Sequence, residues 1–171
     1  MKKIILTILI IIFFSPNASS DEIYFINFSK VLNQSNAGKK AQDYLKKKIT
    51  SDNKKFKETE KKMRAKEKDL TGKKKLLSAD EYKKEISLLR DQVAKLQKDK
   101  QKSLGDVAIM RAKAKKQLVE KLNPILKSYM EKNNIRLVLD KKEVVIGDSK
   151  LEITQQILDL FNKEVKSLNF K

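Results

Sequence analysis

The feature that most constrains the fold is an apolar residue at every seventh position of a lysine-rich stretch. Ile49, Phe56, Met63 and Leu70 form this repeat, and no proline occurs between Ala37 and Lys75. A seven-residue repeat keeps one side of a helix turned toward a partner, which is the condition for a coiled coil. The stretch therefore predicts one long helix that packs against another helix.

A second long helix follows almost at once. Ser78 and Glu81 have the spacing of a capping box, which marks a helix start, and no proline interrupts the chain until Pro124. If the chain reverses at Leu76 and Leu77, the two helices form an antiparallel hairpin. The expected facing pairs are Leu70 with Tyr82, Met63 with Leu89, Phe56 with Leu96, Ile49 with Leu104, and Leu45 with Val107.

The apolar seam of this hairpin is thin. Asp52, Thr59 and Lys66 stand between the apolar positions of the first helix, and Lys100 and Ser103 interrupt the second. Burying so few large side chains leaves little margin over conformational entropy. We expect the hairpin to bend and to open locally at low cost.

The two ends of the chain have the composition of a small folded body. Ile23–Phe28, Ile135–Asp140 and Val144–Ile146 are short runs of β-branched and aromatic residues that predict three strands, the last two joined by a tight hairpin. Thr154 is the expected N-cap of a final amphipathic helix, and Pro124 is expected to kink the second long helix.

These elements predict an α+β fold in which a small β-sheet body carries a long, protruding antiparallel coiled-coil hairpin. We expect the body to comprise residues 21–36 and 118–171, and the hairpin, called the arm below, residues 37–117. A three-stranded sheet of this size has open edges and a small core, so we expect copies of the body to associate. The candidate oligomerisation residues are Ile23, Phe25, Leu137, Leu139 and Val145.

The first twenty residues have the plan of a secretory signal. Lys2 and Lys3 precede an apolar run from Ile4 to Phe14, and small residues follow it. The alternative is an uncleaved membrane anchor, but a bilayer-spanning helix needs about 20 apolar residues. We expect export to the periplasm with cleavage after Ser20.

Charge and composition restrict the function. The chain has 40 lysine and arginine residues against 22 acidic residues, and it lacks cysteine and histidine. Without thiols or imidazoles it has no usual zinc or haem ligands and few catalytic reagents, so an enzyme is the weakest hypothesis and we expect no metal or cofactor. Residues 46–121 alone have a net charge of +14. In an exported protein, the partners for such a basic surface are anionic lipids, lipopolysaccharide and acidic polypeptides rather than nucleic acid.

The order of these segments resembles the Skp, or OmpH-like, periplasmic chaperones across the whole mature chain. The resemblance lies in the Ile23–Phe28 strand, Ser29–Leu32, the Gly38–Lys40 helix start, the lysine-rich hairpin, Leu137–Asp140 and an Ile153–Thr154 helix start. The family commonly has Asp-Ile-Thr where this chain has Glu152-Ile153-Thr154. The resemblance implies a homotrimer in which three arms enclose a cavity. It also implies an ATP-independent holdase that shields unfolded outer-membrane proteins on their way to the outer membrane.

The candidate client-binding residues lie near the expected arm tip, where cationic and apolar side chains occur together. They are Met63, Leu70, Lys73, Lys74, Lys75, Leu76, Leu77 and Tyr82. For each apolar residue the simpler interpretation is packing within the seam, and for the lysines it is solvation. Two further hypotheses remain: a coiled-coil spacer, and an exported protein that binds anionic lipid or lipopolysaccharide surfaces.

Overall fold

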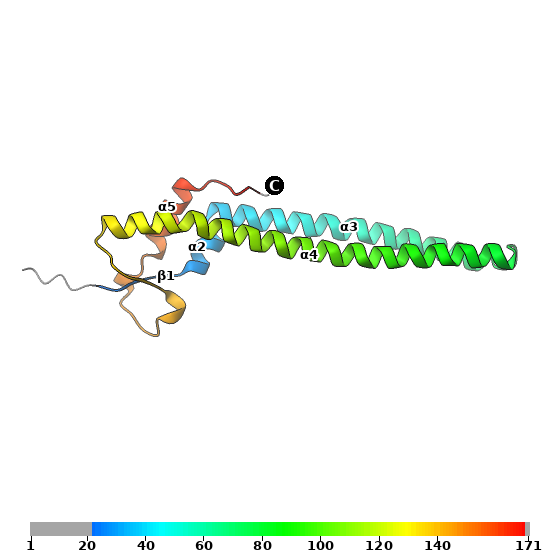
Figure 1. Ribbon diagram of the computed structural model, residues 1–171, viewed down its shortest axis with the longest axis horizontal. Helices are drawn as coiled ribbons and strands as arrows, with labels where there is room; N and C mark the ends of the chain where they lie inside the picture. Colours follow the sequence, from blue (N-terminus) through cyan, green and yellow to red (C-terminus); the bar gives the residue numbers. More distant parts are fainter. Residues whose placement is uncertain (1–21, 170–171) are drawn as a thin grey trace, which may run out of the picture.

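A computed structural model describes residues 22–169, and it shows a long two-helix arm projecting from a small body (Figure 1). Helix α3 (Asn36–Lys73) leads out to the tip, and α4 (Ala79–Lys132) returns into the body. At 1.5 Å per residue, the 38 residues of α3 extend for about 57 Å. The mostly helical α+β architecture with its protruding hairpin is confirmed. The proposed signal segment and its cleavage site lie outside the described residues.

Local sequence explains where the arm helices begin and end. The Ser35 hydroxyl accepts a hydrogen bond from the Gly38 amide at 3.1 Å and so caps α3. A Cβ atom at Gly38 would lie 1.8 Å from the carbonyl oxygen of Leu32, so only glycine fits this close approach.

Ser78 and Glu81 form the predicted capping box at the start of α4. Asn134, which has a left-handed φ of 53°, follows the end of α4. The α4 helix also continues through Pro124.

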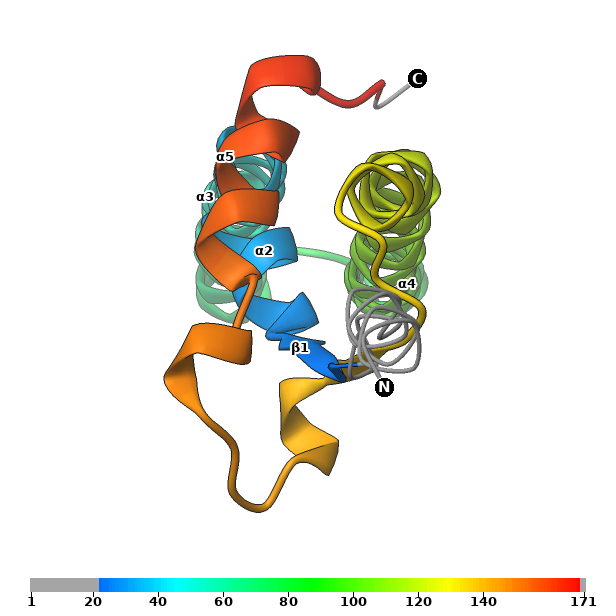
Figure 2. The same cartoon turned by 90° about the vertical axis from the view of Figure 1, so that its left-hand side faces the viewer.

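The body contains a parallel pair of three-residue strands, β1 (Tyr24–Ile26) and β2 (Val138–Asp140). A short helix, α2 (Phe28–Gln34), follows β1, and α5 (Thr154–Glu164) closes the body. In the end-on view of Figure 2, α2 lies between β1 and α5. The largest fully buried apolar side chains come from β1, α2, α4 and α5 and from the residue before α5: Ile26, Val31, Leu122, Ile153, Ile157 and Phe161.

The predicted third strand is wrong. Residues Lys141–Glu143 form a 3-10 helix, and Val144–Ile146 follow it without pairing to any described strand. Val145 is 102% exposed and Ile146 is 92% exposed, so this apolar run is not part of the core. A second 3-10 helix, Ser149–Leu151, leads back to β1, where Glu152 forms an isolated bridge with Phe25. The sheet therefore has two strands, and both are shorter than predicted.

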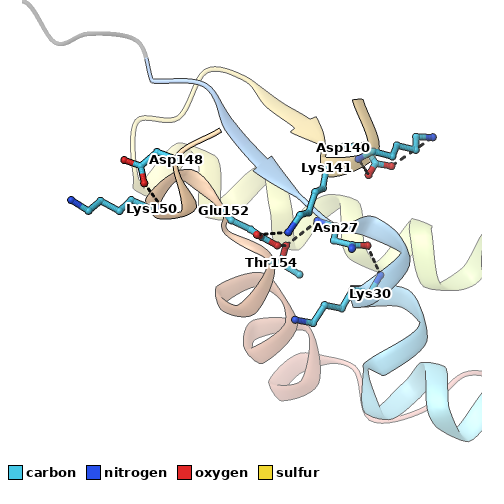
Figure 3. A network of polar contacts seen from close by, with 9 residues as sticks. Asn27, Lys30, Asp140, Lys141, Asp148, Lys150, Glu152 and Thr154 are labelled. Atoms are coloured by element: carbon cyan, nitrogen blue, oxygen red, sulfur yellow. Dashed lines mark hydrogen bonds and ion pairs between the residues drawn. The ribbon is translucent and has the colours of Figure 1, made fainter. Parts of the chain in front are cut away.

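Thr154 is not the N-cap of α5, because Ile153 occupies that position without a side-chain cap bond. The Thr154 hydroxyl instead accepts a hydrogen bond from the Asn27 amide at 2.9 Å and donates one to Glu152 at 2.8 Å. Figure 3 shows this network, which also includes the 2.7 Å ion pair between Glu152 and Lys141. It connects the end of β1 to the start of α5, residues 127 positions apart in the sequence.

Candidate functional site

The arm tip presents the candidate client-binding residues in two environments. Lys73, Lys74 and Lys75 are exposed, and Leu76 is 83% exposed in the turn between the helices. Leu70, by contrast, is 4% exposed and packs into the hairpin. Met63, Leu77 and Tyr82 are half-buried. The tip therefore offers one fully available leucine beside a cluster of ammonium groups.

Two of the three tip lysines make side-chain contacts. Lys73 pairs with Asp69 at 2.8 Å, and the Lys74 ammonium lies 6.0 Å from the centre of the Tyr82 ring, at the limit of a cation–π contact. The Glu81 carboxylate accepts hydrogen bonds from the hydroxyl and the backbone amide of Ser78, and these bonds lower the pKa of Glu81. These bonds join Ser78, the last residue of the turn, to the first turn of α4.

Two interruptions of the seam, Asp52 and Ser103, meet each other across the two helices. Asp52 pairs with Lys48 and also accepts a hydrogen bond from Ser103 at 2.6 Å, and these contacts, the one with Lys48 above all, lower the pKa of Asp52. Glu60 pairs with Lys100, which lowers the pKa of the Glu60 carboxyl. Asp52 and Ser103, at positions that a simple coiled coil would fill with leucine, therefore bond to each other, and Lys100 pairs with a residue beside the seam.

The seam differs from the predicted register at one layer. Leu104, the expected partner of Ile49, is 69% exposed, and Ser103 turns inward to Asp52 instead. The buried seam residues Leu45, Leu89, Leu96 and Val107 agree with the apolar pattern. Further apolar surface lies on α4 where sequence reasoning named no site: Leu88, Val93 and Ile109 are 42–68% exposed. Leu88 and Ile109 lie outside the seven-residue seam. Val93 lies in the predicted seam, seven residues after the half-buried Ile86, and is nevertheless partly exposed.

The candidate oligomerisation residues also divide between core and surface. Ile23 is 50% exposed, Leu137 is 47% exposed and Val145 is fully exposed. Phe25 is 7% exposed and Leu139 is half-buried, so these two residues stabilise the isolated body. In the register of the strands they are direct neighbours. Ile146, which the sequence analysis did not single out, adds to the exposed apolar set.

The described surface provides charge and apolar contact. Among residues 22–169, no three histidine, cysteine, aspartate or glutamate side chains gather as metal ligands. No described helix has both the length and the apolar character needed to cross a bilayer. Buried side-chain polar atoms in this part of the chain all have hydrogen-bond partners.

Comparison with known proteins gives a consistent result. Residues 22–161 match the family described as outer membrane protein (OmpH-like). The fold is similar to the crystal structure of a protein described as an OmpH-like outer membrane chaperone from Caulobacter crescentus CB15, with a TM-score of 0.83. The two chains are 19% identical, and the match covers 87% of this chain and 88% of the other. No curated protein sequence matches the chain.

Proposed function

Because the chain belongs to the OmpH-like outer membrane protein family, we propose that it is an ATP-independent holdase chaperone of the periplasm. In this proposal it captures unfolded outer-membrane proteins between its arms and prevents their aggregation before they reach the outer membrane. The observation that carries the proposal is the long cationic arm with exposed apolar side chains, fixed to a separate packed body. The fold similarity to a protein described as an outer membrane chaperone supports it.

The proposed working unit is a homotrimer joined through the bodies. Two three-residue strands leave open edges, and Ile23, Leu137, Val145 and Ile146 expose apolar surface beside them. Covering such surface and pairing such edges both favour association. Residues 21–36 and 118–171 would form the assembling part, and residues 37–117 the arm. The other part of the proposal, a signal peptide removed after Ser20, accounts for the periplasmic location.

Capture would combine electrostatic attraction with adaptable apolar contact. Three copies of a segment with a net charge of +14 would surround the cavity with a strong positive field, and such a field accelerates the approach of an acidic chain. Leu76 and the half-buried Met63 would then contact apolar client side chains, and methionine adapts well to varied partners. Higher salt should therefore slow capture.

The proposal is tested by native mass spectrometry of residues 21–171, alone and after dilution with an unfolded porin. Three chains alone, and three chains with one porin in the absence of nucleotide, are the expected species. A monomer or dimer that leaves the porin to aggregate would contradict the holdase mechanism.

A second candidate function is binding to anionic lipid or lipopolysaccharide surfaces. The exposed Lys73, Lys74 and Lys75 beside the exposed Leu76 favour it, because this arrangement suits a membrane surface. Vesicles containing anionic lipid would bind the protein at low salt and release it at moderate salt. Vesicle binding without porin protection would select this function over the first.

A further inference from the structure

A groove of about 810 Å³ lies where the arm joins the body. Its walls come from α2 and from the facing parts of α3 and α4, which Figure 1 shows meeting at the body end of the arm. The apolar side chains of its floor are Leu32, Ala41, Leu45, Ala114 and Leu118. These residues are at most 8% exposed, so the floor is firmly packed. The groove is thus a built feature of the fold and lies far from the arm tip.

The rim of this root groove is cationic. Lys46, Arg111 and Lys115 line it and are exposed, and no aspartate or glutamate lines it. The ion pairs of the described residues involve other lysines, and Lys46, Arg111 and Lys115 take part in none of them. An occupant with carboxylates at its edges would therefore find partners, whereas a cationic occupant would be repelled.

Uncharged polar groups also line the groove. Ser29, Asn33, Gln42 and Thr50 provide hydroxyl and amide groups beside the apolar floor. Gln42 donates to both the backbone and side-chain oxygens of Asn33 at 3.2 Å, which links α2 to α3. A peptide backbone needs hydrogen-bond partners when it leaves water, but an acyl chain does not. These groups therefore favour a peptide over a lipid.

We propose that the root groove binds an extended peptide segment in which apolar and acidic residues alternate. Successive side chains of an extended strand point to opposite sides, so the apolar ones would contact the floor while the acidic ones reach the rim. The lining of α3 from Gly38 to Thr50 is about 18 Å long, which five or six extended residues span. This inference rests on the proposed function and identifies an anchor site for the client away from the arm tip.

The probe is a fluorescent ten-residue peptide that alternates leucine with aspartate, and its affinity for the full assembled protein is measured by fluorescence anisotropy. Two control peptides replace either aspartate by lysine or leucine by serine. The charge-reversal variant Arg111→Glu/Lys115→Glu alters the rim at two exposed positions. Its matched control, Lys98→Glu/Lys102→Glu, makes the same charge change on exposed positions of α4 that do not line the groove.

We expect the rim variant to bind the leucine–aspartate peptide at least about tenfold more weakly than the wild type, a change of about 1.4 kcal/mol. The matched control should retain most of the affinity, and both control peptides should bind weakly to the wild type. A second pair of variants blocks the groove without changing charge. Thr50→Trp lies on the rim, and Ser51→Trp is the exposed neighbour outside the lining, so only the first should abolish binding.

Several results would overturn the inference. Equal losses in the two charge-reversal variants would show general attraction rather than a site. Tight binding of oleate with no binding of the peptide would assign the groove to an acyl chain. A change of oligomeric state in Thr50→Trp but not Ser51→Trp would assign it to a second copy of the chain.

A porin aggregation assay separates this inference from the proposed function. If the wild type protects the porin while the rim variant keeps full peptide affinity, the groove inference alone fails. If the wild type binds the peptide in the groove but leaves the porin to aggregate, the holdase function alone fails.

Discussion

The body and the arm are made from the same chain but differ in how completely they exclude water. In the body, Ile26, Val31 and Phe161 are fully buried. In the arm, the best-buried seam residues, such as Leu70 and Leu96, remain 4–7% exposed, and several apolar positions are half-buried. Two helices alone cannot surround a side chain, whereas helices and strands packed in layers can. Because the body residues share one buried core, we expect the body to unfold as one unit. Because the arm residues pack in separate layers along the seam, we expect the arm to open locally, a few layers at a time.

The largest expected effect comes from removing a body side chain. Phe161→Ala should lower the free energy of unfolding by about 3–5 kcal/mol, because Phe161 is fully buried between α5 and its neighbours. Leu96→Ala in the arm should cost only about 2 kcal/mol, since the open seam can relax around the gap. Urea unfolding of the two variants at equal protein concentration makes the comparison. Equal losses would show that the arm and body unfold together.

A matched threonine substitution gives the next largest difference. Thr154→Val should lower stability by about 1–3 kcal/mol, because the part-buried backbone amide of Asn27 loses its hydrogen-bond acceptor. Thr59→Val in the arm should be nearly neutral, since the Thr59 hydroxyl bonds only to the Lys55 carbonyl oxygen of its own helix. Thermal unfolding of both variants tests this. A substantial loss in Thr59→Val would mean that the arm depends on polar contacts as strongly as the body does.

A smaller, local effect is expected at the tip. Ser78→Ala removes the capping box of α4 and should cost about 1 kcal/mol, measured as faster amide hydrogen exchange near the turn. Exchange in α5 should be unchanged. Ser87→Ala, an exposed position inside the same helix, should leave exchange at the tip unchanged or slow it slightly, because alanine favours helix. Faster exchange throughout the body of Ser78→Ala would contradict independent opening of the arm.

The smallest expected effect is pH-dependent. The contacts with Lys48 and Ser103 lower the pKa of Asp52, so the folded arm favours the carboxylate. Its contribution to stability is complete above the ordinary pKa of about 4 and is lost as the pH falls through the lowered value. Thermal melts between pH 7 and pH 2 should show a shallower pH dependence in Asp52→Asn. Asp69→Asn, which removes an exposed carboxylate near the tip, should retain more of the wild-type slope.

The arm was predictable because its signals are local. The seven-residue repeat and the Ser78–Glu81 spacing act within one or two helical turns, and both long helices and the cap are confirmed. The ion pair between Glu60 and Lys100 was not predictable. Glu60 lies beside the seven-residue positions, and its long side chain reaches Lys100 on the other helix.

The body was predicted less well because its contacts are distant in sequence. The helix α2 was missed. Its N-cap is Asn27, whose side chain accepts a hydrogen bond from the backbone amide of Lys30, and an asparagine at this position is a sequence signal for a helix start. Val144–Ile146 has the composition of a strand but no described partner to pair with. Thr154 has a residue type suited to capping, but the Asn27 amide uses its hydroxyl instead. For Val144–Ile146 an absent partner determined the outcome, and for Thr154 a partner more than a hundred positions away did so, whereas the signal for α2 is local. The candidate client-binding residues could be placed on the tip, but their binding role remains a prediction.

Because β1 pairs with β2, the arm leaves the body and returns to it at neighbouring points. Residues 24–26 and 138–140 lie side by side, so everything between α2 and the end of α4 leaves and re-enters the same body. Arm length is therefore an adjustable dimension. Deleting one seven-residue repeat from each helix near the middle would shorten the reach by about 10 Å and leave the strand pairing and the α5 packing intact. In the proposed trimer, chain variants of graded arm length would therefore test whether the size of the largest protected client depends on arm length.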